Sequence, residues 1–249
     1  MALRLPAVIS ACLFDLDGVL TETAVLHAEA WKQAFDELLS RRAARSGDTF
    51  VPFDQLRDYD AYVDGRPRLD GTRGFLHARG IELPEGTPLD PPSAETVHGV
   101  AQHKNELVLA LTKERGVEVY PGSLRFLDEV RRTALLTAVV SASENTAAVL
   151  HAAGLEGRFD TCVDGIVAAE EKLAGKPAPD TYLAAARRLG VAPGEAAVFE
   201  DALAGVEAGR RGGFGLVVGV DRVGQADALS EHGADLVVAD LVELIEASP

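Results

Sequence analysis

The sequence predicts an α/β fold: a doubly wound parallel (Rossmann-like) sheet core that carries an inserted, mostly helical cap domain. Short apolar runs rich in β-branched residues alternate with helical spacing, which is typical of a parallel sheet covered on both faces. One stretch near the N-terminus breaks this alternation. The length of 249 residues suits a core with one inserted subdomain better than one average domain.

Five apolar runs are expected to form the strands of the core, because each is apolar on both faces and is bounded by Gly, Asp or Ser. They cover residues 8–14, 134–140, 196–199, 216–220 and 236–238. Helical spacing separates them: Leu124, Leu127 and Val130 recur after Pro121, and a later helix is expected to end at Gly190. This order favours parallel strands joined by helical crossovers.

Residues 24–118 contain no strong strand pattern. We assign them to a helical cap domain, inserted into a core made of residues 1–23 and 119–249. Amphipathic spacing predicts cap helices over residues 27–39 and 95–113. The stretch between these helices is polar and rich in Gly, Pro, Arg and Asp.

Charge and cysteine content narrow the class of function. The chain has 24 Lys and Arg against 39 Asp and Glu, a formal net charge of −15, which opposes binding to nucleic acid. Cys12 and Cys162 both lie in apolar stretches, so we exclude a disulfide scaffold and expect a reducing, cytoplasmic location. No apolar stretch is long enough to cross a membrane. An anionic substrate would need cations supplied locally.

Two carboxylates follow the first apolar run, in the segment Phe14-Asp15-Leu16-Asp17-Gly18. Alternate residues of an extended chain point to the same side, so Asp15 and Asp17 are expected to share one side. Gly18 allows the chain to turn sharply. A solvated turn is the alternative, but two acids and a glycine directly after a fully apolar strand favour a functional site.

Three further loops carry polar residues at the ends of predicted strands or the starts of helices. Residues 140–145 (VSASEN) offer hydroxyl and N–H groups that suit a phosphate, with simple helix capping as the alternative. Lys176 lies in the turn GKPAPD, where it would be a fixed point charge; a surface lysine is the alternative. Glu200 and Asp201 end a predicted strand, with favourable placement at a helix dipole as the alternative.

Ligands of open α/β sheets bind outside the carboxyl ends of the strands. Six polar side chains are therefore expected to converge there: Asp15, Asp17, Ser141, Lys176, Glu200 and Asp201. Four carboxylates together repel one another, and a hard divalent cation such as Mg²⁺ would relieve that repulsion. Acids, a cation and one lysine at a single edge are suited to phosphoryl transfer.

The segments FDLDGVL, VSAS, GKPAPD and FEDALAG, in this order, resemble the four motifs of the haloacid dehalogenase superfamily of phosphotransferases. The resemblance implies that Asp15 is the nucleophile, forming an aspartyl-phosphate, and that Asp17 is the general acid/base. Residues implied to hold the transferring phosphate are Ser141, Ala142 through its amide, Ser143 and Lys176. Implied Mg²⁺ ligands are Asp15, the Asp17 carbonyl, Glu200 and Asp201. By the same resemblance the peptide before Pro177 is expected to be cis.

The chain is also similar to a subfamily of sugar-phosphate mutases within this superfamily. Thr23, His27 and Trp31 lie at four-residue steps and form one stripe on a helix. SASEN, GKPAPD and the cap segment GRPRLDG resemble the same subfamily. The resemblance implies that Arg68 binds the distal phosphate of the substrate and that Asn145 assists at the phosphate site.

His27 is implied to hydrogen-bond the hinge or the catalytic acid, with packing of the cap helix as the alternative for His27 and Trp31. For Arg68 the alternative is a surface charge. The chain departs from the subfamily at Glu144 and Asp64, where basic residues are expected, and at residues 46–62 and 84–92, which lengthen the cap.

The expected activity is Mg²⁺-dependent phosphoryl transfer that interconverts β-D-glucose 1-phosphate and glucose 6-phosphate. A phosphatase acting on small sugar or other phosphate monoesters is the alternative, because the core motifs are shared. A non-catalytic binding module is a third reading, disfavoured by the presence of every motif acid. The expected partner is a small phosphorylated sugar, with no nucleic acid and no membrane, and the chain is expected to act as a monomer.

Overall fold

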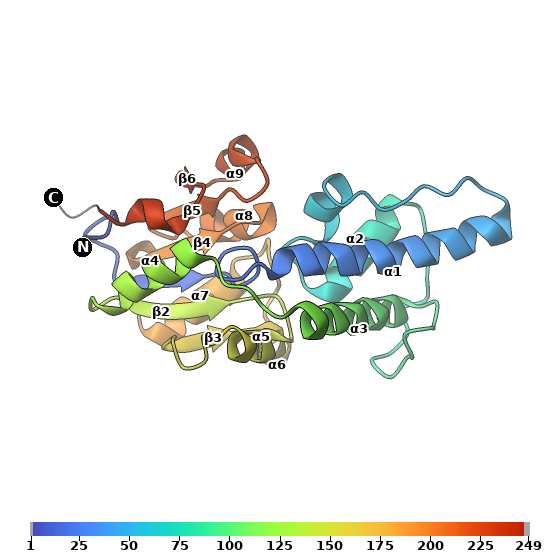
Figure 1. Cartoon of the computed structure of the whole chain (residues 1–249), viewed down its shortest axis with the longest axis horizontal. Helices are drawn as coiled ribbons and strands as arrows, with labels where there is room; N and C mark the ends of the chain where they lie inside the picture. Colours follow the sequence, from blue (N-terminus) through green and yellow to red (C-terminus); the bar gives the residue numbers. More distant parts are fainter. Residues whose placement is uncertain (1, 247–249) are drawn as a thin grey trace. The chain divides into compact units, whose positions relative to one another are not determined.

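The computed structural model describes residues 2–246 and divides the chain into two compact units (Figure 1). The first, Met1–Glu22 with Val117–Pro249, is called the core unit below, and the second, Thr23–Gly116, the cap unit. Among the described helices, none combines the length and the apolar character that a membrane span requires.

The core unit is built on a parallel sheet of six strands in the order β3-β2-β1-β4-β5-β6. The strands are β1 (Ala11–Phe14), β2 (Leu136–Val140), β3 (Thr161–Val163), β4 (Ala196–Glu200), β5 (Leu216–Val220) and β6 (Leu236–Val238). The order places β1 at the centre, with β2 and β4 on either side. The doubly wound α/β class predicted from the sequence is confirmed.

Helices cover both faces of this sheet, because β1 is apolar on both sides. Cys12 and Phe14 contribute to one hydrophobic cluster, and Ala11 and Leu13 to the other. The first cluster is closed by α4 (Pro121–Arg131), α5 (Thr146–Ala152) and η3 (Leu241–Leu244). The second is closed by α7 (Asp180–Leu189), α8 (Leu203–Arg211) and α9 (Ala226–Glu231). Two short helices, α6 (Gly165–Glu170) and η2 (Pro193–Glu195), complete the unit.

The strand predictions differ from the structure mainly at the first and third strands. The run predicted from residue 8 starts as a strand at Ala11, because the Ile9 N–H donates to the Pro6 carbonyl in a turn that leaves Val8 58% exposed. Strand β3 was not predicted, because three residues are too few to form a recognisable apolar run. The predicted runs 216–220 and 236–238 agree with β5 and β6, and Gly190 ends α7 in the left-handed conformation, as predicted.

The described residues of the cap unit form helices and loops. Its elements are α1 (Thr23–Ser46), η1 (Tyr59–Val63), α2 (Arg68–Ala78) and α3 (Val97–Arg115). An aromatic cluster forms the interior: the Phe35 ring lies 5.0 Å from that of Trp31, 5.2 Å from Phe53 and 4.1 Å from Phe75. These rings join α1 to α2 and to the long connection between them.

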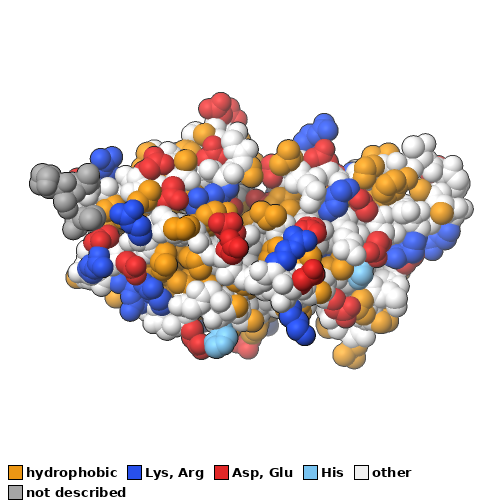
Figure 2. Space-filling view, viewed as in Figure 1, with side chains coloured by type: hydrophobic (Ala, Val, Ile, Leu, Met, Phe, Trp, Pro, Cys, Tyr) orange, Lys and Arg blue, Asp and Glu red, His pale blue; other side chains and the backbone are white. Residues whose placement is uncertain are grey.

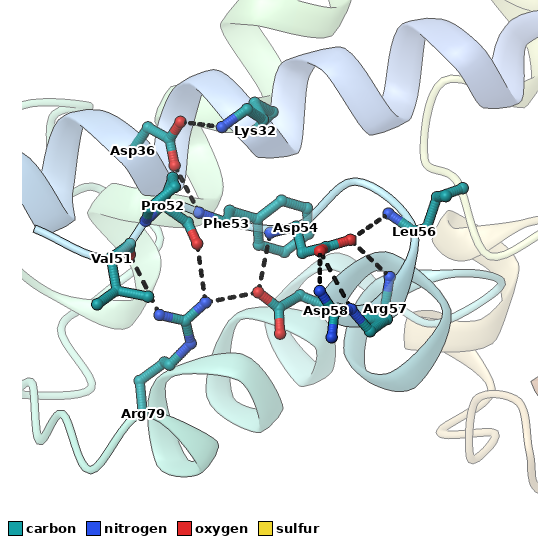
Figure 3. A network of polar contacts seen from close by, with 10 residues as sticks. All are labelled: Lys32, Asp36, Val51, Pro52, Phe53, Asp54, Leu56, Arg57, Asp58 and Arg79. Carbon is teal, nitrogen blue, oxygen red and sulfur yellow. Dashed lines mark hydrogen bonds and ion pairs between the residues drawn. The ribbon is translucent and has the colours of Figure 1, made fainter.

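Polar contacts fix that connection, as Figure 3 shows. We call them the cap network; its side chains are Lys32, Asp36, Asp54, Arg57, Asp58 and Arg79. The Arg79 guanidinium donates to the carbonyls of Val51 and Pro52, at 3.2 and 3.0 Å, and to Asp58 at 2.6 Å. From α1, Asp36 accepts the N–H of Phe53 at 2.7 Å. Asp36 on α1 and Arg79 at the end of α2 thereby hold residues 51–53 of the connection between these two helices.

Candidate active site

Lys176 is the centre of a buried polar cluster at the carboxyl edge of the sheet in the core unit. Its Nζ donates to Asp15 Oδ1 and to Glu200 Oε1, each at 2.5 Å, and to the Val140 carbonyl at 3.1 Å. The Lys176 side chain is 1% exposed, so it is not a surface lysine. It lies in a turn, and its peptide bond with Pro177 is cis, as expected from the resemblance.

Strand register explains why the two carboxylates meet. The central strands β1 and β4 are parallel neighbours in which Phe14 pairs with Phe199, and their rings stack at 4.7 Å. Asp15 follows β1 directly, and its N–H donates to the Phe199 carbonyl at 3.0 Å. Glu200 is the last residue of β4. Adjacent parallel strands therefore place Asp15 and Glu200 side by side.

Asp201 completes an acidic group with these two residues. Asp15, Glu200 and Asp201 are buried, and each offers one carboxylate oxygen within 4.8 Å of the others. Two glycines make room for this group. A Cβ on Gly18 would lie 1.7 Å from Asp201 Oδ2, and a Cβ on Gly205 would lie 1.8 Å from Glu200 Oε1. The glycines of DLDG and DALAG are thus required by close approach of the acids.

The electrostatics of the cluster favour a bound cation. Burial raises the pKa of Asp15 well above its usual range, against the opposing charge of Lys176 and reinforced by Glu200 and Asp17. Burial disfavours the Lys176 ammonium, but Asp15 and Glu200 more than offset this and raise its pKa. With all groups ionised, three carboxylates and one ammonium sum to −3 + 1 = −2. Oxygen donors with a surplus charge of −2 fit a divalent metal ion.

The loop after β2 lies beside this cluster, because Val140 supplies one of the acceptors of Lys176. Ser141 is 1% exposed, and its Oγ accepts the N–H of Ser143 at 3.1 Å. The Oγ of Ser143 in turn accepts the N–H of Asn145 at 3.1 Å. Asn145, not a serine, is the N-cap of α5, so the two hydroxyls shape the turn rather than cap the helix.

Asp17 lies two residues beyond Asp15 in a tight turn. The N–H of Gly18 donates to the Thr21 carbonyl at 2.7 Å, and Gly18 has a φ of 88°. Asp17 is half-buried, and its charge contributes to the raised pKa of Asp15. The structure thus brings together residues from all four predicted loops.

The predicted cap residues lie within the cap unit, where α3 contacts three of them. Thr23 begins α1 and is buried, and His27 and Trp31 follow on the same helix. Lys104 lies in α3, is 4% exposed, and places its Nζ 3.0 Å from His27 Nδ1 and 4.9 Å from the centre of the Trp31 ring. Arg68, the first residue of α2, donates to Asn105 Oδ1 at 2.8 Å.

Sequence reasoning missed two residues of these clusters. Lys104 could have been recognised as buried from the sequence, because it lies four residues from both Val100 and Val108, inside the apolar stripe of the predicted helix. Tyr182 is fully buried and its hydroxyl donates to Glu200 Oε1 at 2.8 Å, while Lys176 Nζ lies 5.0 Å from the centre of its ring. The spacing of Tyr182 in the sequence predicts only that it lies on the apolar face of a helix, and not that its hydroxyl contacts Glu200.

The surface charge is mixed on the face that Figure 2 shows. Acidic and basic side chains are interspersed there, with small apolar areas between them. The net charge of −15 is therefore not gathered into one patch on that face. Attraction of an anion depends on local cations such as Lys176 rather than on this surface as a whole.

Comparisons with known proteins agree with this architecture. The family model described as haloacid dehalogenase-like hydrolase matches residues 9–213. A β-phosphoglucomutase from Mycobacterium bovis is 54% identical over 246 residues, covering 98% of this chain and 94% of the relative. A β-phosphoglucomutase from Bacillus subtilis is 31% identical, covering 94% and 91%. The crystal structure of β-phosphoglucomutase from Clostridium difficile matches with a TM-score of 0.74 and 27% identity, covering 95% and 93%.

A doubly wound sheet with an aspartate, a lysine and an acid pair at one edge defines the class, and the chain belongs to the haloacid dehalogenase superfamily. Within it, the chain is closely related to the β-phosphoglucomutases over almost its whole length. The superfamily resemblance noted in the sequence is confirmed.

Proposed function

We propose that this enzyme interconverts β-D-glucose 1-phosphate and glucose 6-phosphate through an aspartyl-phosphate at Asp15, with Mg²⁺ as cofactor. The observation that carries the proposal is the Asp15–Lys176–Glu200 cluster, with its Nζ–oxygen distances of 2.5 Å, in a chain 54% identical to a β-phosphoglucomutase. A small phosphorylated sugar is the proposed partner. We further propose that it acts as a monomer in the cytoplasm, and the two free cysteines fit a reducing environment.

Charge neutralisation is the central problem of this chemistry. A carboxylate about 3.5 Å from a phosphate dianion is opposed by roughly 9 kcal/mol at an effective dielectric near 20. Lys176 supplies one compensating charge, fixed by three acceptors. Mg²⁺, held by Asp15, the Asp17 carbonyl, Glu200 and Asp201, would supply the rest by screening the charge that develops on the phosphoryl oxygens.

Proton transfer is assigned to Asp17. As a sugar hydroxyl attacks phosphorylated Asp15, Asp17 would take the hydroxyl proton, and in the reverse direction it would return a proton to the leaving sugar oxygen. The phosphoryl oxygens would be held by the loop after β2. The groups concerned are Ser141, the Ala142 amide, Ser143 and Asn145.

Cap residues are assigned to the non-reacting part of the substrate. Arg68 would bind the distal phosphate, and its neighbour Arg66 has a buried Nε with no hydrogen-bond partner among the described residues. Thr23, His27 and Trp31 would contact or orient the substrate from α1. The buried Lys104 supports this assignment, because it adds a cation beside His27.

Product analysis tests the proposal. The enzyme is supplied with Mg²⁺, β-glucose 1-phosphate and a trace of glucose 1,6-bisphosphate, and the reaction is followed by phosphorus NMR. We expect glucose 6-phosphate to accumulate, with the α anomer of glucose 1-phosphate unchanged as the matched control. Release of inorganic phosphate without glucose 6-phosphate would overturn the mutase assignment.

A phosphatase is the second candidate, favoured by the hydrolase description of the matching family model. It would use the same Asp15 chemistry, with water as the final phosphoryl acceptor. Inorganic phosphate as the main product, from β-glucose 1-phosphate or from other small monoesters, would establish it.

A further inference from the structure

The turn that follows β5 reaches two of the acid-bearing loops, although it carries none of the four motifs. We call residues 221–225 the β5 loop. Asp221 fixes its shape, since one carboxylate oxygen, Oδ1, accepts the N–H groups of Val223, Gly224 and Gln225 at 3.3, 2.7 and 2.8 Å. Gly224 takes the left-handed conformation that this turn requires, with a φ of 81°. The loop is therefore a defined structure.

Arg222 extends from this loop to the turn that carries Asp17. Its Nε donates to the Gly18 carbonyl at 2.8 Å, and one terminal nitrogen donates to the Val19 carbonyl at 3.2 Å. Gly18 directly follows Asp17, and a Cβ on Gly18 would lie 1.7 Å from Asp201 Oδ2. A guanidinium that binds two consecutive carbonyls thus sets the position of the backbone between two acids of the site.

The rest of the Arg222 side chain is held just as firmly. It lies 3.5 Å from the centre of the Tyr120 ring and is 13% exposed. Its terminal nitrogens also donate to Ser123 Oγ at 3.2 Å and to the Ala239 carbonyl at 3.1 Å. A planar guanidinium with several fixed partners in different directions has one orientation, which a lysine could not reproduce.

Gln225 extends from the same loop to the other acid-bearing loop. Its Nε2 donates to the carbonyl of Asp201 at 3.1 Å. Strands β4 and β5 are parallel neighbours with Glu200 paired to Gly219, which explains why the loops at their carboxyl ends are adjacent. Two side chains of this loop therefore bind the backbone directly after Asp17 and the backbone of Asp201.

We propose that Arg222 and Gln225 are positioning residues of the active site, Arg222 for proton transfer by Asp17 and Gln225 for the metal-binding carboxylate of Asp201. The proposal rests on the proposed function for the roles of those two aspartates. It predicts that loss of each contact impairs a different step. Loss of Arg222 impairs protonation of the leaving oxygen, and loss of Gln225 weakens metal binding.

Leaving-group dependence separates the Arg222 contact from a general structural role. A sugar phosphate loses an alkoxide that needs a proton, whereas p-nitrophenyl phosphate loses a phenolate that is stable without one. We expect Arg222→Lys to lower kcat for total phosphoryl transfer from β-glucose 1-phosphate by roughly 10- to 100-fold. For β-glucose 1-phosphate, kcat/KM should fall by the same factor. For p-nitrophenyl phosphate, kcat/KM should change by less than about threefold, because it reports the transfer that releases nitrophenolate and not the later attack on phosphorylated Asp15.

Mg²⁺ affinity measured by titration calorimetry tests the Gln225 contact without any turnover. Gln225→Met keeps the size of the side chain but removes the donor, and we expect Mg²⁺ to bind roughly 10-fold more weakly. Activity at saturating Mg²⁺ should recover for both esters. Arg210→Met is the matched control, because Arg210 lies on α8 with a side chain that is 69% exposed, and it should leave every measurement unchanged.

The outcomes distinguish this proposal from the proposed function. Equal losses on both esters for Arg222→Lys, or no loss on either, would overturn the role of Arg222. Unchanged Mg²⁺ affinity in Gln225→Met would overturn the role of Gln225. Formation of inorganic phosphate instead of glucose 6-phosphate would contradict only the mutase assignment, because the ratio of the two esters and the calorimetry remain interpretable for a phosphatase.

Discussion

The buried cluster of the core unit and the cap network of Figure 3 both consist of carboxylates paired with Lys or Arg, but their net charges differ. In the cap network, Asp36, Asp54 and Asp58 are each paired with a cation, namely Lys32, Arg57 and Arg79, so the charges sum to zero. In the core cluster, Lys176 pairs with Asp15 and Glu200, and Asp201 lies beside them, so three carboxylates and one ammonium sum to −3 + 1 = −2. The cap network also keeps contact with water, with the Arg79 side chain 22% exposed, against 1% for Lys176.

The difference in net charge is the one expected between a polar network that stabilises a loop, as in the cap, and one suited to binding a ligand, as in the core. Every carboxylate of the cap network also accepts backbone N–H groups from residues 53–57, so its bonds are used to fix the chain. The core acids instead lie close to one another, each with a carboxylate oxygen within 4.8 Å of the others, in room that Gly18 and Gly205 leave for their side chains. Burying like charges together is costly, and the buried acidic group that the fold keeps here fits a divalent cation. Variants in the two clusters should therefore differ in activity and in their response to Mg²⁺.

The largest expected effect is that of Asp15→Asn, compared with Asp58→Asn in the cap network. Asp15→Asn removes the proposed nucleophile, and kcat for phosphoryl transfer should fall by roughly 10⁴-fold or more. Asp58→Asn should change kcat by less than about twofold, because the Asp58 carboxylate accepts from Arg79 and from the Asp54 N–H, both within the cap network. Steady-state assays with β-glucose 1-phosphate check both values. Turnover by Asp15→Asn within tenfold of the unmodified enzyme would rule out the nucleophile assignment.

The next largest effect concerns stability, for Lys176→Met compared with Arg79→Met. Removing Lys176 leaves Asp15 and Glu200 buried without their shared cation, which should cost about 3–5 kcal/mol of unfolding free energy. Arg79→Met should cost about 1–3 kcal/mol, since it breaks bonds to a partly exposed carboxylate and two carbonyls. Denaturant unfolding measures both.

Mg²⁺ should distinguish the two variants further. It should stabilise Lys176→Met more than it stabilises the unmodified enzyme, because a divalent cation at the acidic group replaces the lost charge. Arg79→Met keeps the acidic group and should gain only as much stability as the unmodified enzyme gains. The comparison uses Mg²⁺ against an equal ionic strength of NaCl. Identical responses of the two variants would show that Mg²⁺ does not replace the charge of Lys176. No response in either variant or in the unmodified enzyme would show that the core cluster is a structural network only.

The convergence of the four loops could be predicted from the sequence because it depends on one rule. Strands of a parallel sheet end at the same edge, which brings Asp15 and Glu200 together, and Lys176 joins them from the turn before α7. The register of β1 against β4 then fixes the contact. The inserted cap was visible for a similar reason, as a break in the alternation of strands and helices.

The supporting residues could not be predicted, because their partners are set by tertiary structure. Arg222 and Gln225 bind backbone carbonyls, which every residue possesses, so no partner type marks them. Tyr182 looks like an apolar helix position until its hydroxyl is seen beside Glu200. Strand β3 is visible only through its pairing with β2, since three residues carry no periodic signal.

A smaller effect is expected for Tyr182→Phe, which sharpens the comparison within the core cluster. Burial, with the charge of Glu200 next, raises the pKa of Tyr182 well above its usual range, so the hydroxyl remains a donor. Its removal should cost about 1.5–3 kcal/mol of unfolding free energy, the range for a hydrogen bond to a charged group. Mg²⁺ should bind about threefold to tenfold more weakly, because Glu200 is less firmly oriented. Unchanged stability and unchanged Mg²⁺ affinity together would contradict a role for this hydroxyl.

The smallest effect is expected for Lys32→Met in the cap network. Lys32 and Asp36 form an (i, i+4) pair on α1 with side chains 35% and 24% exposed, and such pairs contribute about 0.3–0.5 kcal/mol. Asp36→Ala should cost more, about 1–2 kcal/mol, because it also removes the acceptor of the Phe53 N–H. Unfolding at low and at high salt tests this, since screening should abolish the Lys32 effect and leave most of the Asp36 effect. Equal, salt-dependent losses in both variants would mean that ion pairing, rather than backbone hydrogen bonding, holds the cap segment in place.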